Sequence, residues 1–365
     1  MKTSRAAIFH GPNQPFTLET VAVPPLREGE ILVRNAYTTL CRSDLNTFCG
    51  KRTEKTPTIL GHEIVGHIEE MGPGAPVADC RGNNLAVGDL VTWAIYASDP
   101  DSEMARAGIP QKASGLFKYG HERVDPNNHL HGGLADYCIL RRHTPVIRIT
   151  EPIPLPVLSL INCSVATMAG ALRLAGPLAG RDVLTTGAGM LGVIGCAMCR
   201  SAGARNVIAL DVNDERLAVA RKFGATAIHN AARDGGLTKD RAASLEPGAN
   251  ITVAIDLSGV PETMEGMMGV LGIGGVAVLV GATHPARAIA VSAEQIVRSL
   301  HTIRGLHNYN GGDFVAAVEF IERHHRDYPF ADLVEVGFEL GAVNEAFDRG
   351  LNSGAFRIGV RTGDC

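Results

Sequence analysis

The order of hydrophobic and polar positions divides the chain into two regions. In the first, short runs rich in β-branched and aromatic residues are bounded by Gly, Pro and Asn, a pattern that predicts β-strands. The runs are residues 6–10, 31–40, 64–72, 87–96 and 136–149. A polar stretch without periodicity, residues 97–131, predicts a surface lobe. The first region is therefore predicted to be mostly β.

From about residue 165 the hydrophobic segments alternate between strand and helix patterns. Predicted strands cover 181–186, 206–212, 252–259 and 275–282, and predicted helices cover 165–176, 190–204, 214–225 and 262–271. Such alternation predicts βαβ units and a parallel sheet. We expect an α/β protein with a doubly wound domain at 165–306 and a discontinuous, mostly-β domain at 1–164 and 307–365.

Composition narrows the expected partners and location. The chain has 365 residues, 45% of them hydrophobic, which is enough for two cores. A formal net charge of −4 gives no reason to expect nucleic acid or an anionic membrane as a partner. The N-terminal residues lack an apolar signal region, and no run of about 18 apolar residues is evident. These features predict a cytoplasmic protein, in which the eight cysteines would be free thiols or metal ligands.

A glycine-rich loop follows the first strand of the second region. It contains Gly187, Gly189, Met190, Leu191 and Gly192, and it opens an apolar helix. This strand–loop–helix context is the one in which G-x-G-x-x-G binds the pyrophosphate of a dinucleotide at the helix N-terminus.

An acidic residue ends the next strand, at the position that contacts the adenosine ribose in such folds. Asp211 lies 24 residues after Gly187 and would repel a 2′-phosphate, so NAD is favoured over NADP. Arg216, on the helix that follows, keeps binding of NADP as an alternative.

Three residues have the chemistry of a zinc site. Cys41 and His62 each have a carboxylate close by in sequence, Asp44 and Glu63, which suits a zinc ligand and its outer hydrogen-bonding partner. A catalytic zinc needs a third protein ligand and one open position, and Cys163 lies just before the dinucleotide domain.

With these motifs the chain resembles the zinc-dependent alcohol dehydrogenases of the medium-chain dehydrogenase/reductase superfamily over nearly its whole length. The zinc signature is Gly61-His62-Glu63-x-x-Gly66-x(5)-Gly72. The resemblance implies a GroES-like catalytic domain, a Rossmann cofactor domain, one catalytic zinc on Cys41, His62 and Cys163, and oxidation of an alcohol with NAD⁺.

The resemblance also implies roles for single residues. In the family, the counterparts of Ser43 accept the alcohol proton, those of Asp44 orient the histidine ligand, and those of Glu63 lie beneath the metal. Contacts to the cofactor are implied for three further residues: Arg42 and Arg357 at the pyrophosphate, and Thr167 at the nicotinamide.

Two departures from the family pattern matter. Residues 96–131 contain no cysteine, so the second, structural zinc of many relatives is expected to be absent. Position 46 is Asn, where relatives often carry a histidine that passes the proton to solvent. Because an amide is not a base, the outer part of the proton relay has no assigned residue.

The substrate is predicted only by class. Segments 108–122, 175–180 and 302–309 resemble a bacterial branch associated with phosphonate catabolism, and similar enzymes oxidise terpene alcohols. We favour a secondary cyclic alcohol such as 5-exo-hydroxycamphor, in a pocket formed by Asn46, Phe48, Trp93 and Tyr96. The alternative is a hydroxyalkylphosphonate, held by a basic cluster defined by Lys118, His121, Arg123 and His131.

Two other functions stay open at this point. One is a zinc-independent enzyme similar to quinone reductases, and the other is a dinucleotide-binding protein without activity; the complete ligand set argues against both. Relatives are homodimers or homotetramers, and we expect pairing between subunits at residues 275–282 and 288–295.

Overall fold

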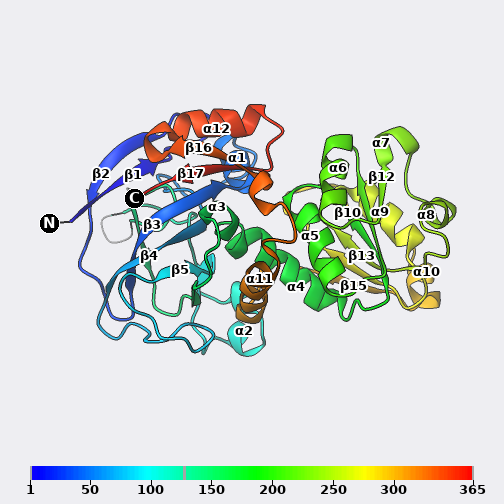
Figure 1. The fold of residues 1–365 in the computed structure, drawn as a ribbon, viewed down its shortest axis with the longest axis horizontal. Helices are drawn as coiled ribbons and strands as arrows, with labels where there is room; N and C mark the ends of the chain where they lie inside the picture. The colour runs from blue at the N-terminus through cyan, green and yellow to red at the C-terminus, as the bar shows by residue number, and fades with distance from the viewer. Residues whose placement is uncertain (1, 126–128, 364–365) are drawn as a thin grey trace. The chain divides into compact units, whose positions relative to one another are not determined.

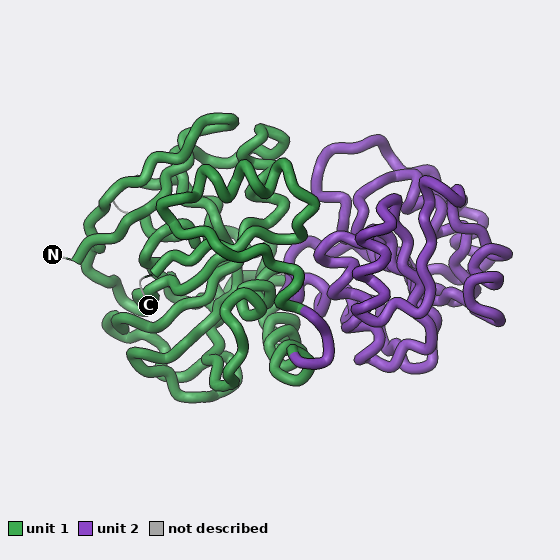
Figure 2. Tube along the Cα trace, turned by 45° about the horizontal axis from the view of Figure 1, so that its top comes forward, with its two compact units in different colours: residues 1–163, 310–325, 330–365 green, residues 164–309, 326–329 purple. Residues whose placement is uncertain are grey.

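The structure is a computed structural model that describes residues 2–125 and 129–363. The chain divides into two compact units, coloured separately in Figure 2. Unit 1 comprises residues 1–163, 310–325 and 330–365, and unit 2 comprises residues 164–309 and 326–329. The chain therefore leaves unit 1, forms unit 2, and returns.

Unit 1 is built on a mixed sheet in the order β16-β17-β3-β4-β5-β9, with β8 paired to β3 (Figure 1). Two further sheets of two strands each, β1-β2 and β6-β7, complete the unit. The strands of unit 1 are β1 (Thr3–Ile8), β2 (Thr17–Ala22), β3 (Ile31–Leu40), β4 (Glu63–Met71), β5 (Leu90–Trp93), β6 (Tyr96–Ala97), β7 (Phe117–Lys118), β8 (Tyr137–Leu140), β9 (Val146–Arg148), β16 (Val334–Glu339) and β17 (Arg357–Arg361). Its helices are α1 (Arg42–Phe48), α2 (Glu103–Arg106), α3 (Leu155–Leu158), α11 (Gly311–His324) and α12 (Val343–Asn352).

The central strand of unit 1 is where the sequence pattern was strongest. β3 is ten residues long, rich in β-branched and aromatic residues, and buried over most of its length. Its partner β4 approaches closely at Gly66, where a Cβ would lie 2.4 Å from the Arg34 carbonyl oxygen. The predicted strand at 136–149 is instead two strands, because His143 takes a positive φ of 67° in the turn between β8 and β9.

Unit 2 is a six-stranded parallel sheet in the order β12-β11-β10-β13-β14-β15. Its strands are β10 (Asp182–Thr186), β11 (Asn206–Asp211), β12 (Ala227–Asn230), β13 (Ile251–Asp256), β14 (Val276–Leu279) and β15 (Thr302–Gly305). Its helices are α4 (Ala166–Ala175), α5 (Met190–Ser201), α6 (Asp214–Lys222), α7 (Ala231–Asp234), α8 (Lys239–Leu245), α9 (Pro261–Val270) and α10 (Ala293–Arg298). The strand order reverses between β10 and β13, which is where doubly wound folds bind ligands.

The segment expected to pair with a second subunit does not form an edge of this sheet. β14, within the predicted pairing segment 275–282, is bonded to β13 on one side and β15 on the other. Its backbone groups are therefore not available to a second chain. The exposed edge is β15, and the following predicted segment, 288–295, contains no strand.

One helical run among the described residues has the length and composition of a membrane span. Leu155–Ala175 has a mean hydropathy of 1.7, but 72% of that window is buried inside the protein. Burial of this kind is typical of a core helix, so the run is weak evidence for a membrane span.

Candidate metal centre and dinucleotide loop

The three predicted zinc ligands come from three separate segments of unit 1. Cys41 is the N-cap of α1, His62 immediately precedes β4, and Cys163 lies within a π-helical turn at Ile161–Val165. The ligand atoms of these residues and of Glu63 all lie within 4.8 Å of one another. Two thiols and one imidazole match the donor set of a catalytic zinc that keeps one open position.

Asp44 links the two ligand segments. Its carboxylate accepts hydrogen bonds from the backbone N–H of Cys41 at 2.8 Å and from that of Gly61 at 3.4 Å. The Nδ1 atom of His62 lies 3.4 Å from the same carboxylate. With Nδ1 directed at Asp44, Nε2 is the nitrogen available to a metal. The predicted role of Asp44 in orienting His62 therefore has a geometric basis.

The carboxylate of Glu63 is held by hydrogen bonds from two other side chains. Arg357 donates to both of its carboxylate oxygens, at 2.7 and 2.9 Å, and the Thr39 hydroxyl donates at 2.5 Å. The Arg357 and Glu63 side chains are 3% and 0% exposed. Burial raises the pKa of Glu63 although the Arg357 charge opposes it.

Arg357 also reaches the metal ligands. Its Nη2 lies 3.6 Å from Cys41 Sγ, and its Nη1 donates to the backbone carbonyl of Phe356. A hydrogen bond from Cys163 lowers the pKa of Cys41, and the Arg357 charge lowers it further against the effect of burial. One thiolate is thus favoured before any metal binds. A contact of Arg357 with pyrophosphate stays a prediction. The contact between Arg357 and Cys41 was not predicted from the sequence.

Other predicted polar residues are distributed around α1 and α4. Ser43 is half-buried and directly follows exposed Arg42 in the first turn of α1, and Asn46 lies one turn later. Thr167 is half-buried in the first turn of α4, in unit 2. Their contacts with substrate or cofactor stay predictions.

The aromatic residues expected to form a substrate pocket are largely core residues. Phe48 packs against the rings of Phe16 and Phe347 at centroid distances of 5.8 and 5.3 Å. Trp93 and Tyr96 are 0% and 1% exposed, and Trp93 belongs to the hydrophobic core beneath β3 and β4. These placements argue against the expected substrate wall at Phe48 and Trp93, because their apolar surfaces are already covered by other side chains.

The predicted basic cluster is less basic than its sequence suggests. Burial lowers the pKa of His131 to about 3, and burial also lowers the pKa of His121. Arg123 is exposed. Among the four residues, Lys118 is the half-buried cation.

In unit 2, glycine suits each of its positions in the cofactor loop for a different structural reason. Gly187 has a φ of 91°, which favours glycine. A Cβ on Gly192 would lie 1.9 Å from the Gly187 carbonyl oxygen, so the helix can approach the loop only without a side chain. Gly189 is the N-cap of α5 and has open space where a Cβ would be. That open space, next to the first amides of α5, suits the close approach of a phosphate.

Asp211 ends β11 and closes the loop from the other side. One carboxylate oxygen accepts the Ala188 N–H at 2.5 Å, and the other accepts the N–H groups of Val212 and Asn213 at 2.7 and 2.9 Å. Arg216 is exposed in the first turn of α6. The carboxylate is therefore held in place beside the loop, where the sequence predicts a ribose contact.

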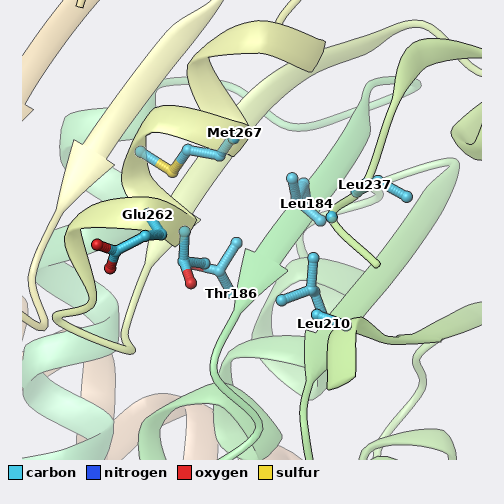
Figure 3. A pocket seen from close by; sticks show the side chains of 10 residues that line it. Leu184, Thr186, Leu210, Leu237, Glu262 and Met267 are labelled. Carbon is cyan, nitrogen blue, oxygen red and sulfur yellow. The ribbon is translucent and has the colours of Figure 1, made fainter. Parts of the chain in front are cut away.

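A cavity of about 220 Å³ adjoins the same strand ends (Figure 3). Thr186 and Leu210, which directly precede Gly187 and Asp211, line it together with Met267 of α9. Its lining is mostly apolar, as a site for a flat aromatic base requires. This cavity was not predicted from the sequence, although the positions just before the loop and just before Asp211 were a usable signal.

A second group that the sequence analysis missed lies beside His62. The rings of His62 and His121 are 5.1 Å apart between centroids. The Nδ1 atom of His121 lies 3.1 Å from Glu54 Oε1, and Arg52 Nε lies 2.7 Å from the same oxygen. Nothing in the spacing of Arg52 and Glu54 along the chain predicts this, since their partner lies in the distant lobe.

Two protein families match the two halves of the chain. The family described as alcohol dehydrogenase GroES-like domain matches residues 27–151, and the family described as zinc-binding dehydrogenase matches residues 191–323. An L-threonine 3-dehydrogenase of Streptomyces avermitilis is 31% identical over 295 residues, which is 80% of each chain.

Solved structures show the same fold. An alcohol dehydrogenase from Thermotoga maritima matches with a TM-score of 0.90 and 24% identity over 99% of this chain and 100% of that one. A zinc-binding dehydrogenase from Sinorhizobium meliloti 1021, bound to NADP, matches with a TM-score of 0.84 and 19% identity over 99% of this chain and 100% of that one. At these identities the structures establish the fold alone. Together with the family matches and the ligand geometry, they show that the chain belongs to the zinc-dependent alcohol dehydrogenases of the medium-chain dehydrogenase/reductase superfamily.

Proposed function

We propose that this protein oxidises an alcohol to a carbonyl compound with NAD⁺, using one catalytic zinc per subunit. The observation that carries the proposal is the convergence of Cys41, His62 and Cys163 within 4.8 Å, with Asp44 positioned behind the histidine. When bound, zinc supplies Lewis-acid polarisation of the alcohol oxygen. Absence of the structural zinc stays a prediction, based on the cysteine-free lobe.

The residues around the site hold the ligands and offer a proton acceptor. Asp44 lies 3.4 Å from Nδ1 of His62, and the charge of Arg357 favours the charged form of Cys41. Ser43, two residues from Cys41 and half-buried, is the proposed acceptor of the alcohol proton. Asn46 has no basic group, so the proton must leave Ser43 by another route.

The test of the proposed function is the appearance of NADH with zinc-loaded protein. The substrates are L-threonine, 5-exo-hydroxycamphor, a hydroxyalkylphosphonate and simple primary and secondary alcohols. L-Threonine is included because the matched relatives carry its name. Turnover that disappears with zinc removal and returns with zinc supports the proposal. No turnover of any alcohol with zinc bound would refute it.

The terpenoid preference rested on an apolar wall at Phe48 and Trp93, but Trp93 is buried in the core and Phe48 is half-buried and packed against the core. The terpenoid preference therefore loses its support, and 5-exo-hydroxycamphor is kept as the comparison substrate. The zinc-independent alternative predicts turnover that survives zinc removal, and the non-enzymatic alternative predicts no turnover at all, so the same assay distinguishes them.

NAD is the proposed cofactor because of Asp211, and NADP is the alternative because of Arg216. Asp211→Ser is expected to lower the ratio of kcat/KM for NAD⁺ to that for NADP⁺ by about 10- to 100-fold, through loss of a charge-assisted hydrogen bond to the ribose and of repulsion toward a 2′-phosphate. Asp214→Ser, an exposed change three residues away, is the control. An unchanged ratio in Asp211→Ser would contradict the assignment.

Assembly as a homodimer or homotetramer and a cytoplasmic location stay proposals. The exposed edge strand β15 supports self-association, because Ile303 on it and the nearby Val297 and Leu300 are 37%, 71% and 71% exposed. The measurement is light scattering of the purified protein, in which a monomer would contradict the proposal.

A further inference from the structure

Lys118 lies on a segment of unit 1 that packs against the segment carrying the candidate metal ligand His62. Lys118 ends the short strand β7 and pairs with Tyr96 of β6. The turn that follows packs on the segment carrying His62, since a Cβ on Gly120 would lie 2.7 Å from the Gly61 carbonyl oxygen. The fold thus fixes Lys118 beside the ligand segment.

The acidic groups close to Lys118 are already paired. Glu54 is held by Arg52 at 2.7 Å and by His121 at 3.1 Å, with its side chain 10% exposed. Glu122 is held by Lys55 at 2.7 Å. Both carboxylates act electrostatically on Lys118, but each has another cation or hydrogen-bond donor as its direct partner.

The ammonium group of Lys118 has no hydrogen bond or ion pair with any residue that the structure describes, although the side chain is half-buried. Burial lowers the pKa of its ammonium group, and the positive charges of Arg52 and Lys112 lower it further. A half-buried cation without a partner is costly, and an anion would relieve that cost. The local charge therefore favours a bound anion.

We propose that Lys118 binds an anionic group on the alcohol substrate, and so selects alcohols that carry a carboxylate or a phosphonate. This inference rests on the proposed function and names its substrate class. The ring contact between His121 and His62 places the Glu54–His121 pair at the metal ligands. Glu54 in turn acts electrostatically on Lys118.

Two substrate chemistries share this requirement. A 3-hydroxy amino acid carries its carboxylate on the carbon next to the alcohol carbon, and a hydroxyalkylphosphonate carries a phosphonate at a similar reach. A terpene alcohol has no anionic group. Comparing L-threonine with 2-hydroxyethylphosphonate separates the two sources, and neutral 2-butanol and 1-propanol serve as matched alcohols without the charge.

The first test uses steady-state kinetics of Lys118→Met, Lys118→Arg and a control, Lys112→Met. Lys112 is exposed in the same lobe, so its replacement removes the same charge without the partly buried group. Lys118→Met is expected to raise KM for the anionic substrate by about 10- to 100-fold, the equivalent of one charge-assisted hydrogen bond. It is expected to leave kcat, and kcat/KM for the neutral alcohol, within about twofold. Lys118→Arg should keep most of the affinity.

The second test measures binding without turnover. L-Threonine and 2-hydroxyethylphosphonate are titrated calorimetrically into the zinc-loaded protein saturated with NADH. Binding by wild type and Lys112→Met, but not by Lys118→Met, supports the proposal and identifies the anion. Equal affinities in all variants, or no binding of either anion, would overturn it.

The two tests separate this inference from the proposed function. Turnover of neutral alcohols at full rate, with no effect of Lys118→Met on any substrate, overturns the anion subsite and leaves the dehydrogenase assignment intact. Lack of turnover with every alcohol rejects the dehydrogenase assignment, and the titration still decides whether Lys118 binds the anion.

Discussion

Replacing Cys163 with serine is expected to remove zinc from the protein and to lower kcat by more than about 100-fold. Loss of an outer-shell partner already costs about 10- to 100-fold in metal affinity or activity, and loss of a direct ligand must cost more. A serine hydroxyl cannot replace the thiolate, because its oxygen stays protonated and is a harder donor. Zinc content by plasma mass spectrometry and NADH appearance measure the two effects.

Binding of NADH should survive this change, since the glycine loop and Asp211 belong to unit 2 and Cys163 to unit 1. Cys49→Ser is the matched control. Cys49 is also a partly buried thiol of unit 1, but it is absent from the four-residue ligand cluster. Full turnover by a zinc-free Cys163→Ser protein would exclude the proposed metal centre.

Arg357→Met is expected to destabilise unit 1 by about 3–5 kcal/mol, because it leaves the Glu63 carboxylate buried without its partner. The relevant geometry is the pair at 2.7 Å with side chains 3% and 0% exposed. Trp93, the single tryptophan, lies in the core of unit 1, so its fluorescence during urea unfolding follows this unit. Adding Glu63→Gln to Arg357→Met should recover part of the lost stability, since the amide removes the unpaired charge.

The chain offers a control pair of the same length at the surface. Arg349 Nε lies 2.7 Å from Glu335 Oε1, but these side chains are 54% and 34% exposed. Arg349→Met should lower the stability far less than Arg357→Met does, because an exposed ion pair is screened by solvent. Similar losses for Arg349→Met and Arg357→Met would show that burial does not strengthen the Arg357–Glu63 pair.

Local sequence patterns predicted most of the regular elements that position the site. The run of β-branched residues at 31–40 coincides with β3, and the strand, glycine loop and helix around Gly187 coincide with β10 and α5. These elements were predictable because each depends on residues close together in the chain. The strand β2 was missed because it is exposed and polar, and so has no hydrophobic pattern.

The chemistry of the candidate ligands could likewise be predicted from neighbouring residues. Cys41 with Asp44, and His62 with Glu63, are each a local pairing of a ligand and a carboxylate. The contacts that each carboxylate makes could not be predicted in this way. Asp44 bridges two ligand segments, and Glu63 is paired to Arg357, which lies 294 positions away in the chain.

By itself the sequence determined the alternation of strands and helices, the glycine loop and the candidate zinc ligands, because these follow from local spacing and residue chemistry. Only the tertiary structure decided which charges are paired. It buried Trp93 in the core, packed one side of Phe48 against other aromatic rings, and buried two histidines of the basic cluster. It also left the ammonium group of Lys118 without a hydrogen-bond or ion-pair partner among the described residues. Burial and pairing depend on segments far apart in the chain, and no local pattern records them.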